Sequence, residues 1–137
     1  MNYLLDTNAC IALMNGAPAA VRVRFEKAIH ENSQICIPSV VSFELWYGIA
    51  KSARIEINTR RLETLLSSAA ISLPFDHEDS RAAGSIRARL EAVGRPIGAY
   101  DYLIAGQALA RQLILVTANV SEFSRVKGLI WQDWAKP

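Results

Sequence analysis

The sequence predicts an α/β fold in a single domain over residues 1–137, with a short parallel sheet covered by helices on both faces. Short segments that are apolar throughout alternate with segments of helical periodicity, which is typical of a parallel sheet buried on both sides. The length of 137 residues suits one domain, and 51% of the residues are hydrophobic. No linker, internal repeat or low-complexity segment divides the chain.

The first half of the chain is predicted to hold two strands, over residues 3–5 and 34–37, and four helices. Gly16 should end the first helix, and Pro18 and Pro38 suit the starts of the second and third. The helices are expected at about residues 9–14, 18–30, 38–51 and 57–70, of which the last two form an antiparallel pair.

The second half begins with a predicted strand over residues 71–74 and a long helix over residues 77–93. Residues 94–98 contain two glycines and a proline and should form a loop. A helix over residues 100–111 and an apolar strand over residues 113–116 follow. A last short strand is expected near residues 129–131.

Three of the thirteen acidic residues lie where a solvated carboxylate is not expected. Asp6 follows the first strand, and ligands bind at the carboxyl edge of such sheets. Glu44 shares its helix face with Val40 and Val41, a face that we expect to pack against the sheet. Asp101 begins a helix whose following turns are apolar. We expect these three side chains to converge on one pocket.

Each of these carboxylates also has a purely structural interpretation. Asp6 could cap the next helix, Asp101 could stabilise its own first helical turn, and Glu44 could pair with an Arg. The three together favour a hard divalent cation, Mg²⁺ or Mn²⁺, because close carboxylates cannot all ionise without compensation. Such a site hydrolyses phosphodiester bonds with a metal-activated water.

A polar segment follows the predicted strand over residues 113–116. Thr117 and Asn119 are neutral and could orient water or substrate, although a simple turn would use the same residues. The sequence has no phosphate-binding glycine loop and no arrangement of a Ser–His–Asp triad. Asn8 stands where a phosphoaspartate phosphatase would need a second Asp, which argues against that class.

Net charge and cysteine content are less informative. A formal charge of +2 is too small to indicate nucleic-acid binding, although most basic residues are Arg. Cys10 and Cys36 lie in apolar stretches and are expected to be buried free thiols. The N-terminus does not resemble a signal peptide, and no apolar run approaches the roughly 20 residues of a membrane span. We therefore expect a cytoplasmic protein that does not bind membranes.

Four segments, in order along the chain, resemble toxins of the VapC type, which belong to the PIN-domain ribonuclease family. They are LLDTN at Asp6, SVVSFELWYG at Glu44, GRPIGAYDYLIAGQALA at Asp101 and LVTANVSEFSRVKGLIWQDW near the end. The resemblance implies a three-layer α/β/α PIN-like domain and an endoribonuclease that cuts structured RNA, such as tRNA or rRNA. Asp6, Glu44 and Asp101 match the family's metal site. Asn119 stands where many members have a fourth Asp, which puts a second metal in doubt.

The resemblance also implies a homodimer and a small antitoxin that covers the active site. Residues Trp46, Tyr47 and Ile49 could form a groove for an antitoxin helix with the apolar residues of the next helix, or the two sets could close an internal hairpin. That second set is Ile57, Leu62, Leu65 and Leu66. Candidates for contact with the substrate are Asn8, Arg87, Arg89, Arg95 and Arg125.

Two other functions remain open from the sequence. A non-catalytic module with a PIN fold that binds RNA or protein is supported by Asn119 alone. A nuclease that acts on DNA is equally compatible with three carboxylates, because the chemistry at phosphorus is the same.

Overall fold

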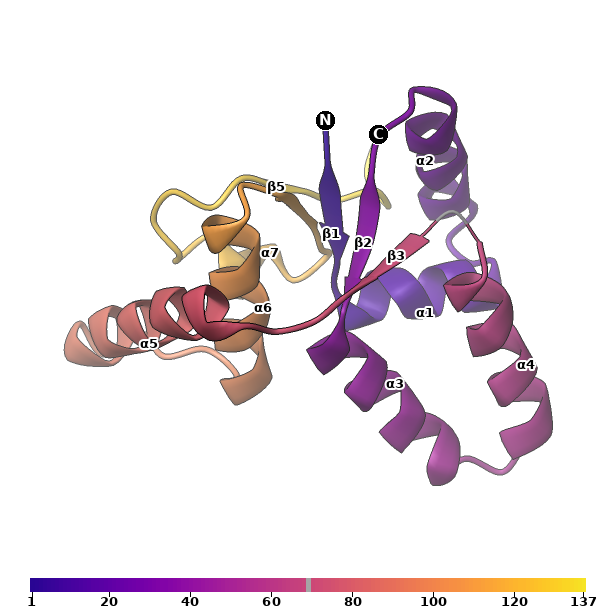
Figure 1. Ribbon diagram of the computed structural model, residues 1–137, viewed down its shortest axis with the longest axis horizontal. Coiled ribbons are helices and arrows are strands. Elements are labelled where there is room, and N and C mark those ends of the chain that lie inside the picture. Colours follow the sequence, from indigo (N-terminus) through magenta and orange to yellow (C-terminus); the bar gives the residue numbers. More distant parts are fainter. Residues whose placement is uncertain (69) are drawn as a thin grey trace.

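A parallel sheet of five strands, in the order β3-β2-β1-β4-β5, forms the centre of the protein (Figure 1). The computed structural model describes residues 1–68 and 70–137. The sheet confirms the predicted fold class. Its strands are β1 (Tyr3–Leu5), β2 (Ile35–Pro38), β3 (Ala70–Leu73), β4 (Ile114–Val116) and β5 (Trp131–Gln132).

The helices cover the sheet on both faces, as three layers require. On one side lie α1 (Thr7–Asn15), α2 (Ala19–His30), α3 (Ser39–Ala50) and α4 (Ile55–Leu66). On the other side lie α5 (His77–Ala92), α6 (Ala99–Ala110) and α7 (Val120–Phe123) (Figure 1). This distribution follows from right-handed crossovers that first run outward to β3 and then return past β1 to β4.

The strand order reverses beside β1. The chain moves from β1 to β2 and β3 on one side, and β4 then pairs with the other side of β1. The crevice at the carboxyl ends of the strands on either side of such a reversal is the usual ligand-binding site of open α/β sheets. Asp6 and Thr117 directly follow β1 and β4, and the Asp6 amide donates to the Val116 carbonyl at 3.1 Å.

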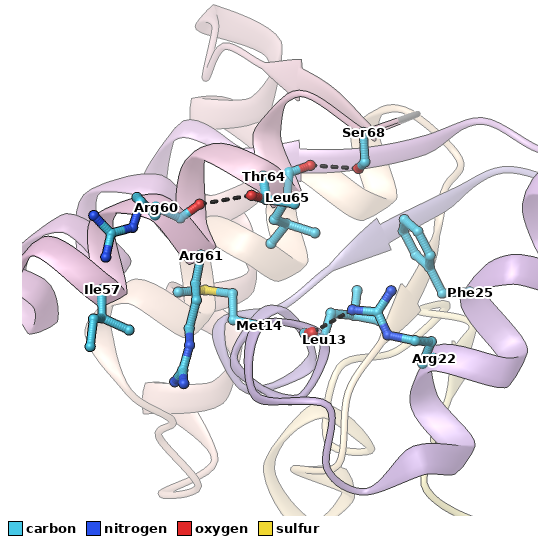
Figure 2. A pocket seen from close by; sticks show the side chains of 10 residues that line it. All are labelled: Leu13, Met14, Arg22, Phe25, Ile57, Arg60, Arg61, Thr64, Leu65 and Ser68. Atoms are coloured by element: carbon cyan, nitrogen blue, oxygen red, sulfur yellow. Dashed lines mark hydrogen bonds between the residues drawn. The ribbon is translucent and has the colours of Figure 1, made fainter.

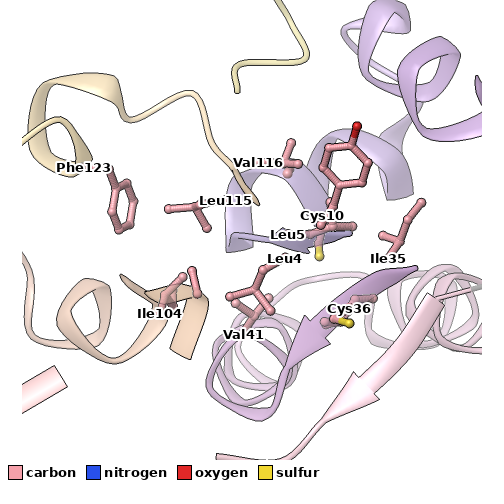
Figure 3. Close-up of a cluster of buried hydrophobic side chains, with 14 of the residues drawn as sticks. Leu4, Leu5, Cys10, Ile35, Cys36, Val41, Ile104, Leu115, Val116 and Phe123 are labelled. Carbon is pink, nitrogen blue, oxygen red and sulfur yellow. The ribbon is translucent and has the colours of Figure 1, made fainter. Parts of the chain in front are cut away.

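The core lies where the strands are covered on both sides (Figure 3). Leu4, Leu5, Ile37 and Leu115 have no exposed side-chain surface, which explains why these strands are apolar throughout rather than alternating. Cys10 and Cys36 are buried free thiols, as predicted. Among the described residues, no helix is both long and apolar enough to cross a lipid bilayer.

Some predicted boundaries are wrong. The fourth helix does not reach Ala70: α4 ends at Leu66, and Ala70 is the first residue of β3. A short apolar run in the sequence fits a helix and a strand equally well, so it could not locate this boundary. The helix ends at Leu66, before Ser67 and Ser68. The four-residue helix α7 was not expected. The last strand begins at Trp131, later than predicted.

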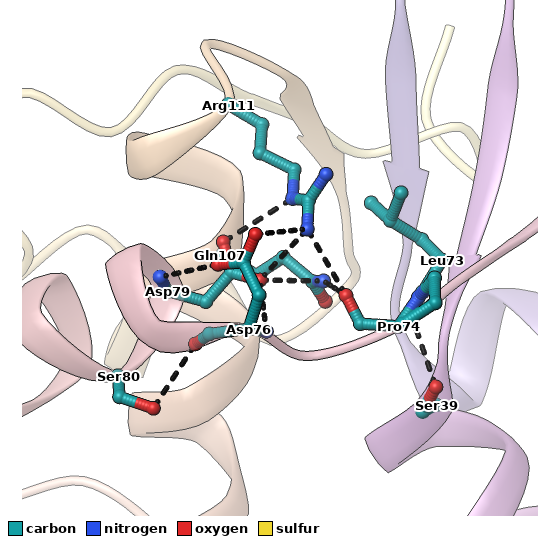
Figure 4. Close-up of polar contacts among 8 residues, drawn as sticks. All are labelled: Ser39, Leu73, Pro74, Asp76, Asp79, Ser80, Gln107 and Arg111. Atoms are coloured by element: carbon teal, nitrogen blue, oxygen red, sulfur yellow. Dashed lines mark hydrogen bonds and ion pairs between the residues drawn. The ribbon is translucent and has the colours of Figure 1, made fainter.

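A buried polar cluster joins α5, α6 and the end of β3 (Figure 4). Asp79 is fully buried, and its carboxylate accepts hydrogen bonds from Gln107 Nε2 at 3.1 Å and from Arg111 at 3.1 and 3.2 Å. It also accepts from the Asp76 amide, while Asp76 caps α5 by accepting from the Asp79 amide. Gln107 and Arg111 both donate to the Pro74 carbonyl. The cluster therefore fixes α5 against α6.

Close backbone contact supports the same pair of helices. A Cβ atom on Gly106 would lie 2.5–2.7 Å from the backbone and side chain of Ala83. Only glycine allows α6 to approach α5 this closely, so Gly106 sets the position of the helix that carries Asp101.

Candidate active site

Asp6 is held by the start of α1. Its carboxylate accepts a hydrogen bond from the Ala9 amide at 2.8 Å, so the structural interpretation of this residue as a helix cap is confirmed. The side chain is only 5% exposed. Burial raises the pKa of Asp6, hydrogen bonds from Thr117 and Ala9 oppose the rise, and the negative charges of Glu44 and Asp133 add to it. A capping role and a ligand-binding role are compatible here.

Glu44 lies on α3 opposite the first turn of α1. Thr7 Oγ1 donates to Glu44 Oε1 at 2.8 Å, across 37 residues of sequence. The expected burial of this helix face is confirmed for Val41 alone: α3 buries Val41, Leu45 and Ile49 and leaves Val40 and Glu44 half-buried. No ion pair in the described part of the chain involves Glu44, which also contradicts its pairing with an Arg.

Asp101 occupies the first turn of α6, near α3. The rings of Phe43 and Tyr100, which precede Glu44 and Asp101 in sequence, contact each other with centroids 5.6 Å apart. Burial, a hydrogen bond with Glu122 and the negative charges of Glu122, Glu44 and Asp6 raise the pKa of Asp101 to about 7. The pKa of Asp101 is therefore raised by three other acidic side chains, Glu122, Glu44 and Asp6.

Neutral polar residues connect the carboxylates. Thr117 is buried at the end of β4, its hydroxyl hydrogen-bonds to Asp6, and its Oγ1 accepts from the Asn119 amide at 2.9 Å. Asn119 Nδ2 donates to Glu122 Oε2 at 2.7 Å. The hydrogen bond with Asp101 lowers the pKa of Glu122 most, and the bond from Asn119, the charge of Arg125 and a hydrogen bond from the Gly98 amide add to this effect. The polar segment thus does more than form a turn.

The chemistry of these donors fits a hard divalent cation. Asp6, Glu44, Asp101 and Glu122 supply only carboxylate oxygens, and none of the ion pairs among the described residues neutralises them. In the conformation described, no three His, Cys, Asp or Glu side chains are grouped tightly enough to hold one ion. Asp101 is instead hydrogen-bonded to Glu122, which lies opposite it on α7.

The sequence interpretation missed two acidic residues of this region. Glu122 contacts Asp101 and Asn119, and Asp133 is close enough to raise the pKa of Asp6. Asp133 follows β5 as Asp6 follows β1, so a correct boundary for the last strand would have identified it. Glu122 lies on a helix too short for its periodicity to be recognised.

The predicted substrate-binding residues are dispersed. Arg125 is adjacent to the acidic residues: its positive charge lowers the pKa of Glu122, and its Nη1 donates to the Pro96 carbonyl at 2.9 Å. Arg87 pairs with Glu91 at 3.0 Å on the exposed side of α5. Arg89 and Arg95 are exposed, as is Asn8 in the first turn of α1. Of this set, Asn8 lies in the helical turn that Asp6 caps, and Arg125 lies close enough to Glu122 to lower its pKa.

A hollow lies away from the carboxylates, between α1, α2 and α4 (Figure 2). We call it the arginine hollow; it has a volume of about 300 Å³. Arg22, Arg60 and Arg61 lie around an apolar floor that includes Leu13 and Phe25. Its remaining lining residues are Met14, Ile57, Thr64, Leu65 and Ser68.

The groove suggested from the sequence has a different composition. Ile49, Leu62 and Leu65 are buried, as the internal-hairpin interpretation requires, whereas Trp46, Tyr47 and Ile57 are 41%, 59% and 39% exposed. Leu66 is half-buried. Three of the residues suggested for the groove are therefore part of the core, and the others are partly or largely exposed to solvent.

The family model for the PIN domain matches residues 3–129. The chain belongs to this family. Within it the chain groups with VapC proteins: it is 42% identical to a tRNA(fMet)-specific endonuclease VapC of Shigella flexneri, over 98% of this chain and 99% of that protein.

Solved structures of VapBC proteins are also similar to this chain. One is VapBC2 from Rickettsia felis bound to a DNA fragment from their promoter, with a TM-score of 0.91, 36% identity and coverage of 98% of this chain and 99% of that chain. Another is DNA-bound VapBC from Salmonella typhimurium, with a TM-score of 0.89, 37% identity and coverage of 98% of both chains. The resemblance to VapC toxins inferred from four sequence segments is thus confirmed.

Proposed function

We propose that the protein is a metal-dependent endoribonuclease that acts as the toxin of a toxin–antitoxin pair and cuts structured RNA such as tRNA or rRNA. The observation that carries this proposal is the mutual electrostatic influence of Asp6, Glu44 and Asp101 at the strand-order reversal, where none of the ion pairs among the described residues neutralises them. The tRNA(fMet)-specific endonuclease activity named for the similar Shigella VapC supports the same chemistry.

Asp6, Glu44 and Asp101 are the residues that would hold Mg²⁺ or Mn²⁺, with Glu122 beside them. When bound, the ion supplies an activated water and stabilises negative charge on the phosphate. Thr117 holds the Asp6 carboxylate by a hydrogen bond and the Asn119 amide by another. Asn119 in turn orients Glu122. These neutral groups fix the carboxylates without adding negative charge, and Arg125 offers a cation for an RNA phosphate.

The antitoxin is proposed to cover the active site, as the resemblance implies, and the arginine hollow offers a further surface suited to the same partner. Its three guanidinium groups above an apolar floor are complementary to an amphipathic helix with acidic side chains. The solved VapBC assemblies support a protein partner. A homodimer is proposed on the resemblance to VapC toxins. The exposed side chains of Phe43, Tyr47 and Tyr100 provide an apolar surface for it.

The test is cleavage of total bacterial RNA by the purified protein, freed of any copurified partner, in Mg²⁺, in Mn²⁺ and in EDTA. Glu44→Gln and Asp101→Asn keep the size of each side chain and remove its charge. Both should lower the cleavage rate by at least about 100-fold, because the proposed ion loses a charged ligand. The matched control is Glu56→Gln, an exposed carboxylate on α4, which should cut like the wild type.

Discrete fragments that require metal and disappear in the two site variants would support the proposal. Equal cleavage by wild type and Asp101→Asn would refute it. Cleavage of DNA but not RNA would favour the DNA-directed alternative. No cleavage in either metal, with RNA bound equally well by wild type and both site variants, would favour a non-catalytic binding module.

A further inference from the structure

Gly98 ends the loop before α6, and its backbone does not need glycine. Its φ of −59° and ψ of 147° are extended values that every L-amino acid adopts without strain. Gly94, at the start of the same loop, differs, because its φ of 70° lies in the left-handed region that favours glycine. The surroundings of Gly98, rather than its backbone, must therefore explain the absence of a side chain.

The space beside Gly98 is occupied by the carboxylate of Asp101. A Cβ atom on Gly98 would lie 2.9 Å from Asp101 Oδ2, 3.5 Å from its Cγ and 4.0 Å from its Cβ, the three nearest heavy atoms beyond the chain neighbours. At Gly106 an added Cβ would meet backbone, which cannot move, but at Gly98 it would meet the end of a side chain, which can. A side chain at position 98 would thus displace the Asp101 carboxylate.

The loop itself is held in place, so the carboxylate is the part that would yield. The Ile97 amide donates to the Tyr102 hydroxyl at 3.1 Å, and this bond is buried. The Gly98 amide hydrogen-bonds to Glu122, and the Gly98 carbonyl accepts from the Tyr102 amide at 3.2 Å. The backbone of Gly98 is therefore bound through its amide to α7 and through its carbonyl to α6, and it has little freedom to move away from Asp101.

The start of α5 shows a different use of a carboxylate at the same helical position. Asp79 is the third residue of α5, as Asp101 is of α6. Asp79 accepts from the amide of the capping residue Asp76 at 2.9 Å, whereas the equivalent Gly98 amide bonds to Glu122 instead. Asp101 is thus not required to close a capping box, and when ionised its oxygens can bind a ligand.

We propose that Gly98 is a positioning residue for Asp101: its lack of a Cβ leaves the space that the Asp101 carboxylate needs in order to bind a divalent cation. The proposal rests on the metal-dependent nuclease proposed above. Mg²⁺ accepts oxygen ligands only at about 2.0–2.1 Å and in near-ideal geometry, so a carboxylate displaced by a few tenths of an ångström binds it less well. Gly98 touches neither cation nor substrate in this role.

Unfolding shows whether the carboxylate is the group that yields. In EDTA, Gly98→Ala should have a urea midpoint close to that of the wild type, because the small losses and gains of an alanine at a helix N-cap oppose each other. Gly106→Ala, whose Cβ meets backbone, should have a clearly lower midpoint. If the midpoint of Gly98→Ala fell as far as that of Gly106→Ala, its Cβ would be meeting rigid structure, and the proposal would be wrong.

The position of the carboxylate is followed in metal-free protein. Aspartate labelled with ¹³C in its carboxyl group gives one NMR signal for each Asp, and the Asp101 signal is the one that Asp101→Asn removes. At about pH 9, where this carboxyl is ionised, Gly98→Ala should move the Asp101 signal and leave that of Asp79 unchanged. The matched control Gly84→Ala adds a Cβ with nothing within 4 Å and should not move the Asp101 signal. An Asp101 signal that stays in place in Gly98→Ala would overturn the proposal.

Calorimetric titration with Mn²⁺ then measures the consequence. Gly98→Ala should bind Mn²⁺ roughly tenfold more weakly than the wild type, the scale of losing support for a metal ligand, and Gly84→Ala should bind it equally well. In cleavage of RNA, the Mn²⁺ concentration for the half-maximal rate should rise by the same factor. Gly98→Ser adds the same Cβ together with a hydroxyl that can cap the helix, so it should lose affinity likewise while its fold is retained.

Two outcomes separate this proposal from the one on which it rests. Equal Mn²⁺ affinity of the wild type and Gly98→Ala would refute the role of Gly98 and leave the nuclease intact. A wild type that binds no Mn²⁺ would instead refute the metal site itself, while a displaced carboxyl signal in Gly98→Ala would still support the steric role of Gly98.

Discussion

Asp101→Asn is expected to stabilise the metal-free protein at alkaline pH. Burial and the charges of Glu122, Glu44 and Asp6 raise the pKa of Asp101 from 3.8 to about 7 in the folded state. A shift of that size corresponds to roughly 4 kcal/mol, which screening of this half-exposed carboxyl reduces to about 1–2 kcal/mol. Because the folded pKa is the higher one, stability is retained at low pH and is lost as the pH rises from about 4 to about 7.

The assay is urea unfolding in EDTA at about pH 4.5 and about pH 8, for wild type and Asp101→Asn. Asparagine does not ionise, so the free energy of unfolding of the variant should exceed that of the wild type by a margin that grows by about 1–2 kcal/mol between the two pH values. Glu56→Gln, which removes an exposed carboxylate, should show no such growth. An advantage of Asp101→Asn that is the same at both pH values would refute the electrostatic account of this residue.

Two further predictions concern the packing of α5 on α6. Gly106→Ala should destabilise the fold by roughly 2–3 kcal/mol, because its Cβ would clash with the backbone of Ala83, and urea unfolding measures this directly. Gly84→Ala, in the same helix pair but with open space around its Cβ, should instead raise the free energy of unfolding by about 0.5–1 kcal/mol. Asp79→Ala should lower the free energy of unfolding by roughly 3–5 kcal/mol, because Arg111 would lose its buried carboxylate partner. If its Tm fell no further than that of an exposed Asp→Ala variant, the role assigned to Asp79 would be wrong.

Sequence patterns predicted the fold because its strands are short and apolar and are separated by helices whose ends are marked by specific residues, such as Gly16 at the end of α1. The same patterns drew attention to Asp6, Glu44 and Asp101, because a carboxylate is costly beside apolar residues. Local patterns could not reveal Asp133, because it follows a strand of only two residues whose position was misjudged.

Contacts between distant segments were also inaccessible to sequence reasoning. The arginine hollow combines Arg22 of α2 with Arg60 and Arg61 of α4, and each of these residues alone looks like an ordinary solvated charge. Likewise, the burial of Asp79 follows from its partners Gln107 and Arg111, which lie about thirty residues away. Neither set has a spacing that would mark it.

The position of Asp6 has a practical consequence for anyone preparing an inactive protein for crystallisation with RNA. An alanine at this position removes the oxygen that accepts from the Ala9 amide, and the loss of such a cap costs roughly 1 kcal/mol. An inactive variant made in this way would also be less stable, and a low yield of folded protein could be mistaken for a loss of activity. Asparagine caps helices about as well as aspartate and carries no charge. Asp6→Asn is therefore the variant that separates loss of chemistry from loss of structure.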